Sequence, residues 1–132
     1  RAVEGVARPR PTQWIHAPEA MCKINVDGAA SQNLRRGAAA ALCRDHNGKF
    51  LGASAILVRG IYDPPAQAAL EALAIREALA LAEDLNLQRI HIASDCKAVI
   101  EDLKEQNPAS YGAILHEILE CKAGFQSCKF TF

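Results

Sequence analysis

The feature that most constrains the fold is one long helical segment, residues 67–85, which lies between stretches with the pattern of β-strands. The segment is rich in Ala and Leu, which are strong helix formers. Pro64 and Pro65 separate it from the strands before it, and Asn86 is suited to cap its end in the left-handed conformation. Because a helix between two strands allows a parallel crossover, the segment predicts an α/β fold.

Strand patterns lie on both sides of this helix. Residues 21–28 alternate polar and apolar side chains, and Gly28 is expected to end this strand. Residues 37–45 and 48–59 predict two more strands, joined through Asn47-Gly48, which is a strong hairpin signal. The remaining predicted elements are a strand at 89–94, helices at 95–106 and 111–123, and a strand at 125–132.

This order, β-β-β-α-β-α-α-β, predicts a mixed five-stranded sheet with helices on its faces. Three of its strands would be antiparallel, and two would be reached through helices. Residues 1–20 contain Pro9, Pro11 and Pro18 and show little periodicity, so they are predicted to be a linker or an extended lead-in. A single domain is expected over residues 21–132.

The composition is that of a globular protein and not of a disordered one. Half of the 132 residues are hydrophobic, and 15 basic residues balance 15 acidic residues. The zero net charge argues against purely electrostatic binding to nucleic acid, although it permits a local basic patch. The five cysteines and four histidines show no metal-ligand spacing, and neither a membrane span nor a signal peptide is visible. We therefore expect an intracellular protein, in the nucleus or the cytoplasm, with its thiols in a reducing compartment.

Two acidic residues are predicted at the carboxyl ends of strands. Asp27 ends the first strand, and Asp95 directly follows the fourth. If these two strands are parallel neighbours, the two carboxylates meet at the edge where open α/β sheets bind their ligands. Structural alternatives remain for both residues. Asp27 could be an ordinary strand exit, and either Asp95 or Ser94 could be only the amino cap of the next helix.

A third carboxylate, Glu71, is predicted to point from the apolar side of the long helix. At about 100° per residue, Ile75, Ala78 and Ala82 lie within about 60° of Glu71, whereas the other charged residues of the helix lie on the opposite side. A carboxylate directed at the sheet must be paired, protonated or bound to a metal, because an isolated buried charge is too costly. The alternatives are a salt bridge to a sheet residue such as Lys23, or a side chain that reaches water at the amino end of the helix.

Three carboxylates brought together repel one another unless cations neutralise them. Oxygen ligands suit Mg²⁺ or Mn²⁺, and two such ions about 3.5–4 Å apart catalyse phosphoryl displacement. Asp27, Glu71 and Asp95 therefore predict a two-metal site in which they are the catalytic ligands. A domain whose acidic cluster is neutralised by salt bridges is a competing interpretation.

The chain also resembles the ribonuclease H domain, and in particular the reverse-transcriptase-like, retroelement-type ribonuclease H proteins of plants. The resemblance covers roughly residues 14–132 and rests on the stretches Lys23-Ile-Asn-Val-Asp-Gly-Ala29, Arg44-Asp-His-Asn-Gly48, Glu71-Ala-Leu-Ala74 and Ala93-Ser-Asp-Cys96. It implies the sheet order of that family, 3-2-1-4-5. It also implies that Asp27, Glu71 and Asp95 match the first three carboxylates of the family's metal site.

The resemblance further implies endonucleolytic hydrolysis of the RNA strand in RNA–DNA hybrids, with Mg²⁺ or Mn²⁺ as the cofactor. It places Gly28 and Ala29 where the RNA backbone approaches, and there contacts to the 2′-hydroxyl distinguish RNA from DNA. The family's fourth carboxylate and its product-release residue lie beyond the fifth strand, whereas this sequence ends at Phe132. The family's C-terminal helix is therefore expected to be missing. A non-catalytic ribonuclease-H-like module that binds nucleic acid or a protein partner is the alternative function.

Overall fold

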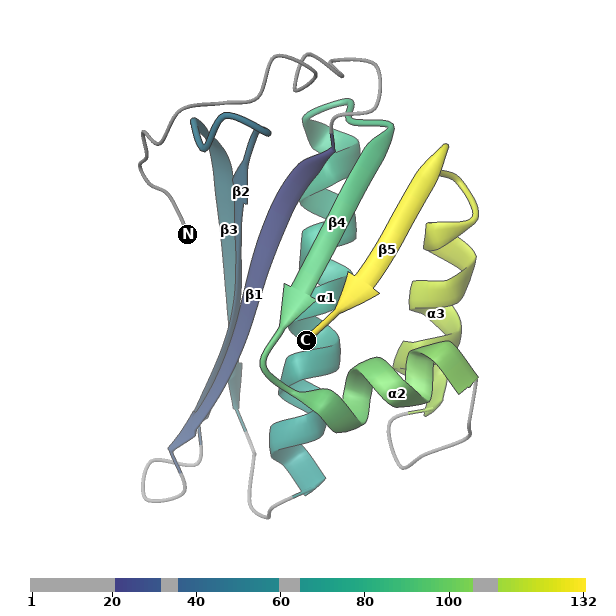
Figure 1. Ribbon diagram of the computed structural model, residues 1–132. Coiled ribbons are helices and arrows are strands. Elements are labelled where there is room, and N and C mark those ends of the chain that lie inside the picture. Colours follow the sequence, from purple (N-terminus) through teal and green to yellow (C-terminus); the bar gives the residue numbers. More distant parts are fainter. Residues whose placement is uncertain (1–20, 32–35, 60–64, 106–111) are drawn as a thin grey trace.

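The computed structural model describes residues 21–31, 36–59, 65–105 and 112–132, which form a five-stranded sheet and three helices (Figure 1). In chain order the elements are β1 (Cys22–Ser31), β2 (Arg36–Arg44), β3 (Phe50–Arg59), α1 (Pro65–Asp84), β4 (Arg89–Ser94), α2 (Lys97–Glu105), α3 (Gly112–Lys122) and β5 (Ser127–Thr131). The sheet order is β3-β2-β1-β4-β5. The predicted element order and sheet order are therefore confirmed. The predicted linker at residues 1–20 lies outside the described residues.

The strand β1 lies at the centre of the sheet and joins its two halves. It pairs antiparallel with β2 and parallel with β4, while β3 and β5 form the two edges. Figure 1 shows α1 lying behind the sheet and running along it. This helix carries the chain from the β3 edge back to β4 on the other side of β1, which is the crossover that a parallel neighbour requires.

The expectation that Gly28 ends the first strand is wrong. β1 continues to Ser31, because its backbone stays paired with β2 in the register Gly28↔Ala39 to Ser31↔Arg36. Its pairing with β4 stops earlier, at Val26 opposite Ser94. Beyond that point β1 pairs with only one of the described strands, so the described sheet opens a notch next to the end of β4.

The hydrophobic core lies between one face of the sheet and the three described helices. Side chains alternate along the strands, so that every second residue is buried against the helices and the others face away. Fully or almost fully buried core residues include Ile24, Ala39, Cys43, Ile92, Ile100 and Ile118. The opposite face is not covered by any described element, and we call it the open face; Leu57 on β3 is 83% exposed there.

The cap after α1 and the hairpin between β2 and β3 form where the local sequence predicts them. Asn86 has a φ of 59°, which confirms the left-handed cap after α1. The hairpin between β2 and β3 is confirmed, although the turn is longer than a two-residue loop because the Asp45 carboxylate accepts hydrogen bonds from the backbone of Asn47 and Lys49. Burial raises the pKa of the Cys43 thiol to about 12, so this residue packs as an apolar side chain. Among the described residues, no helix has the length and apolar character needed to cross a membrane.

Candidate active site

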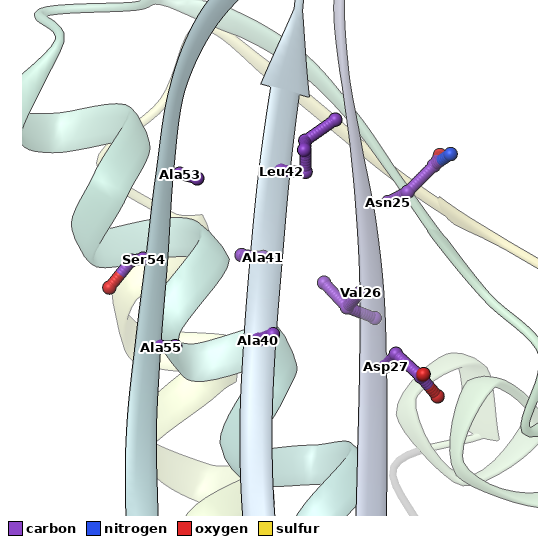
Figure 2. Close-up of a pocket in the computed structure, with 9 residues that line it drawn as sticks. All are labelled: Asn25, Val26, Asp27, Ala40, Ala41, Leu42, Ala53, Ser54 and Ala55. Carbon is purple, nitrogen blue, oxygen red and sulfur yellow. The ribbon is translucent and has the colours of Figure 1, made fainter.

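The notch beside β4 brings two of the predicted acidic residues to one edge. Val26 and Ser94 are the last registered pair of β1 and β4, so Asp27 and Asp95 are the next residues on two strands about 4.8 Å apart. Figure 2 shows Asn25 and Asp27 extending from the same side of β1, as strand alternation requires. Asp27 and Asp95 are both exposed. Only β4 ends at this edge, since β1 continues to Ser31, so Asp27 lies within its strand and Asp95 directly follows β4.

The third carboxylate, Glu71, approaches this edge from the helix layer. Its side chain is only 4% exposed, and it lies on the side of α1 that buries Ile75 and Ala78. It accepts a hydrogen bond of 2.5 Å from the backbone N–H of Gly28 and one of 3.1 Å from the Ser94 hydroxyl. Since one bond comes from β1 and the other from β4, Glu71 lies beneath the notch and is held by both strands.

Gly28 is required for this close approach of helix and strand. A Cβ at position 28 would lie 2.9 Å from the backbone nitrogen of Glu71 and 2.9 Å from the carbonyl carbon of Leu70. Both atoms belong to the helix backbone and have little freedom to move aside. Gln67, one turn earlier on α1, adds a hydrogen bond of 2.6 Å from its side-chain nitrogen to the Gly28 carbonyl. The N–H and the carbonyl of Gly28 are therefore both hydrogen-bonded to side chains of α1.

The electrostatic setting of Glu71 is unusual for a buried carboxylate. Burial raises its pKa, the hydrogen bonds from Gly28 and Ser94 oppose that rise, and the charges of Asp27 and Asp95 add to it. Among the described residues, no lysine or arginine forms an ion pair with Glu71. The salt-bridge alternative is therefore not observed in this part of the chain.

Ser94, not Asp95, makes the capping hydrogen bond before α2. The Ser94 hydroxyl accepts a hydrogen bond of 3.0 Å from the backbone N–H of Cys96, while it donates to Glu71. Ser94 therefore organises the turn before α2, which begins at Lys97, two residues later than predicted. The Asp95 carboxylate makes no hydrogen bond to the described backbone, so it is available for a ligand.

The residue types suit a divalent cation, but the described side chains do not form a ready-made cage. No group of three or more His, Cys, Asp or Glu side chains in the described ranges is arranged to hold a metal ion. The chemistry of the donors still fits Mg²⁺ or Mn²⁺, because all three are carboxylates and the buried one has no cationic partner there. Binding an ion would require Asp27 and Asp95 to turn toward Glu71, which their exposure allows.

Sequence reasoning did not find Ser94 and Gln67 as parts of this site. A signal was present for each of them. Ser94 occupies an inward position of β4, in step with Ile90 and Ile92, and a polar residue there needs a buried partner. Gln67 lies four residues before Glu71, on the same side of α1.

Residues 25–132 match the sequence model of the family described as reverse transcriptase-like. The chain belongs to this reverse transcriptase-like family. None of the curated proteins compared with the chain matches it in sequence.

Solved structures extend the comparison to the fold. RNase H1 from the archaeon Halobacterium salinarum is similar, with a TM-score of 0.75 and 16% identity over 85% of each chain. The N-terminal RNase H domain of a Mycobacterium tuberculosis protein gives 0.73 and 14% identity, over 86% of this chain and 83% of that one. LC11-RNase H1, isolated from compost, gives 0.68 and 15% identity, over 83% and 81%. This member of the reverse transcriptase-like family therefore has the ribonuclease H fold.

Replacing Gly28 with Ala is expected to reduce the free energy of unfolding by about 1–3 kcal/mol, because the added Cβ forces α1 away from β1. Gly112→Ala is the matched control, since a Cβ there meets nothing within 4 Å. Urea denaturation of both variants provides the measurement. Equal stabilities for the two variants would contradict the required close approach.

The raised pKa of Glu71 predicts a pH dependence of stability in metal-free buffer. A carboxyl group whose pKa is higher in the folded state than in the unfolded state stabilises the fold fully only below the unfolded-state pKa, near 4.5. This stabilisation is lost as the pH rises through the folded-state pKa. The unfolding free energy of the wild type, relative to that of Glu71→Gln, should therefore fall as the pH is raised from 4.5 toward 8. Chemical denaturation across that pH range measures the difference in unfolding free energy between the two proteins. A difference that does not change with pH would contradict the raised pKa of Glu71.

Proposed function

We propose that this chain provides a metal-dependent ribonuclease H site that hydrolyses the RNA strand of RNA–DNA hybrids endonucleolytically. The observation that carries the proposal is the Glu71 carboxylate, which is buried beside Asp27 and Asp95 with no ion-pair partner among the described residues. A carboxylate in such a setting is expected to attract a cation. Membership of the reverse transcriptase-like family, and a fold shared with proteins titled RNase H1, support the same proposal.

In this proposal Asp27, Glu71 and Asp95 hold Mg²⁺ or Mn²⁺, with two ions expected. When bound, such ions promote deprotonation of an attacking water and stabilise the departing 3′-oxygen. Glu71 supplies a carboxylate in a fixed orientation, because Gly28 and Ser94 hold both of its oxygens. Asp27 and Asp95 supply carboxylates from the solvent side, where a nucleic acid has access.

Gly28 and Ala29 are the proposed contacts to the RNA backbone. The Gly28 N–H is already donated to Glu71, and its carbonyl accepts a hydrogen bond from Gln67. Ala29 is exposed on the same side of β1 as Asp27. Ala29 is therefore the better placed of the two to meet a 2′-hydroxyl.

A non-catalytic module that binds nucleic acid or a protein partner is the second candidate. It is favoured by the absence, within the described ranges, of three side chains already arranged to hold a metal ion. For either candidate function, we also propose that the chain is a plant retroelement-type protein and that it acts in the nucleus or the cytoplasm.

Millimolar Mg²⁺ or Mn²⁺ is expected to raise the thermal unfolding midpoint of the wild-type chain. An ion that binds only the folded state stabilises it by about 2.7 kcal/mol at one hundred times its Kd. Glu71→Gln should lose most of this shift, whereas Glu120→Gln, on the exposed side of α3, should retain it. Scanning calorimetry with and without the ions makes the comparison. No shift in the wild type would favour the non-catalytic candidate.

Asp27→Asn is expected to abolish cleavage of a labelled RNA–DNA hybrid in Mg²⁺ or Mn²⁺, because it removes a charged metal ligand. The thermal midpoint should stay close to that of the wild type, since Asp27 is exposed and makes no hydrogen bond to the described residues. Asp84→Asn, at the end of α1, makes the same chemical change away from the site and should cleave normally. Gel analysis of the products is the readout, and cleavage that persists in Asp27→Asn would refute the assigned site.

A further inference from the structure

The charges of this neutral chain are separated between its two layers. The helices α1, α2 and α3 contain nine acidic and four basic residues, whereas the five strands contain six basic residues and one acidic residue. Strand alternation and pairing register place all seven charged strand residues on the open face. They are Asp27 and the basic residues Lys23, Arg36, Arg44, Arg59, Arg89 and Lys129. A zero net charge therefore coexists with a basic sheet face.

Four titratable residues form a continuous row across this face. The pairing registers are Arg44↔Lys23, Lys23↔His91 and His91↔Lys129, which place these side chains next to one another on β2, β1, β4 and β5. We call these four residues the basic row. Neighbouring strands are about 4.8 Å apart, and like charges directly opposite one another destabilise a sheet. The directly opposed cations Arg44 and Lys23 are therefore an arrangement that internal stability alone does not favour.

No described acidic side chain forms an ion pair with the basic row. The ion pairs Arg76–Glu117, Lys97–Glu101 and His116–Glu120 join described residues of the helices, and none of them includes a member of the row. Asp45 follows Arg44 in the chain, but its carboxylate is turned to the backbone of the β2–β3 turn.

The behaviour of His91 agrees with an uncompensated positive field. Burial lowers its pKa, and the charges of Lys23 and Lys129 lower it further, with no carboxylate acting in the opposite direction. A ring nitrogen of His91 is hydrogen-bonded to the Thr131 hydroxyl at 2.5 Å, which fixes the ring within the row.

We propose that the basic row binds the phosphate backbone of a nucleic acid, as a contact surface separate from the three carboxylates. Naming the ligand as a nucleic acid rests on the proposed function. Lysine and arginine contacts to phosphates position a nucleic acid without reading its sequence. The row lies four residues from Asp27 along β1, about 13 Å at 3.3 Å per residue, or roughly four base-pair steps of a duplex.

The surface between the basic row and Asp27 is compatible with a polymer that lies along it. A shallow trough of about 480 Å³ opens there on β1, β2 and β3 (Figure 2). The open-face side chains that line it are Asn25, Asp27, Ala40, Leu42, Ala53 and Ala55. Four of these six are alanines or asparagine and none is a bulky aromatic, so they present no obstacle between the row and the acidic edge.

An acidic protein partner fits the basic row less well. Protein interfaces depend on large anchors such as Trp, Tyr or Arg seated in desolvated pockets. The exposed large hydrophobic residues of the described chain are Phe50, Leu57 and Phe132. Phe50 lies opposite Arg44 at the β3 end of the row, but it is 57% exposed and so is not seated in a desolvated pocket. Exposed lysine and arginine side chains on β2, β1 and β5 are better matched to a regular polyanion.

The test measures binding without cleavage, by fluorescence anisotropy of a labelled RNA–DNA hybrid in EDTA over a series of salt concentrations. The variant Lys23→Gln/Lys129→Gln is compared with the wild type and with Lys104→Gln, which removes one lysine from the exposed side of α2. The double variant should bind roughly tenfold or more weakly at 0.1 M salt, and its salt slope should be smaller by roughly two, about 0.9 for each lost phosphate contact. Lys104→Gln should match the wild type in both.

A stability measurement separates loss of binding from loss of folding. Because the row juxtaposes like charges, the double variant should unfold at the same temperature as the wild type or at a higher one. Parallel titrations with duplex DNA, single-stranded RNA and polyglutamate identify the polyanion. Unchanged affinity and salt slope in the double variant, or equal binding of polyglutamate, would overturn the proposal. Failure to cleave in Mg²⁺ would remove the proposed activity and leave the basic row intact, so the two failures are distinguishable.

Discussion

The hydrogen bond between the Gly28 N–H and the Glu71 carboxylate is the interaction on which the candidate site depends. It joins the central strand to the crossover helix at the point where β1 has lost β4 as a neighbour. The absence of a side chain at Gly28 lets the helix backbone approach, and the carboxylate then replaces the missing strand as the acceptor for that N–H. The same contact carries a charged group under the sheet, where desolvation makes it costly unless a cation is bound. The same hydrogen bond therefore fixes α1 against β1 and orients the proposed metal ligand Glu71.

The charge distribution gives the domain two distinct regions on one sheet. At the carboxyl end of β4, three carboxylates lie near one another without a described cationic partner. Further along β1, the basic row places Arg44 and Lys23 opposite each other and Lys129 beyond His91, with no ion pair to a described carboxylate. Each region has unfavourable repulsion within itself, and each would be relieved by a ligand of the opposite charge. Divalent cations and a phosphate backbone are a pair of ligands that satisfies both.

The comparisons indicate how little sequence identity this fold requires. Identities of 14–16% accompany TM-scores of 0.68–0.75 over more than four fifths of each chain. The same fold is therefore reached with few shared residues, as expected where it depends on the alternation of the strands and the apolar side of α1. Gly28, Glu71 and Ser94 are constrained differently, because each makes a particular contact that another residue type would not reproduce.

The sequence alone determined the element order, the crossover helix and the inward position of Glu71, because these follow from local periodicity and from the turn chemistry of residues such as Asn86. The strand order came from a family resemblance and was confirmed by the pairing. Tertiary structure decided that β1 runs past Gly28, that Ser94 and Gln67 belong to the site, and that the strand charges gather on one face. Those features depend on which strand lies beside which and in what register. Register is set by pairing between segments distant in the chain, so no local pattern reveals it.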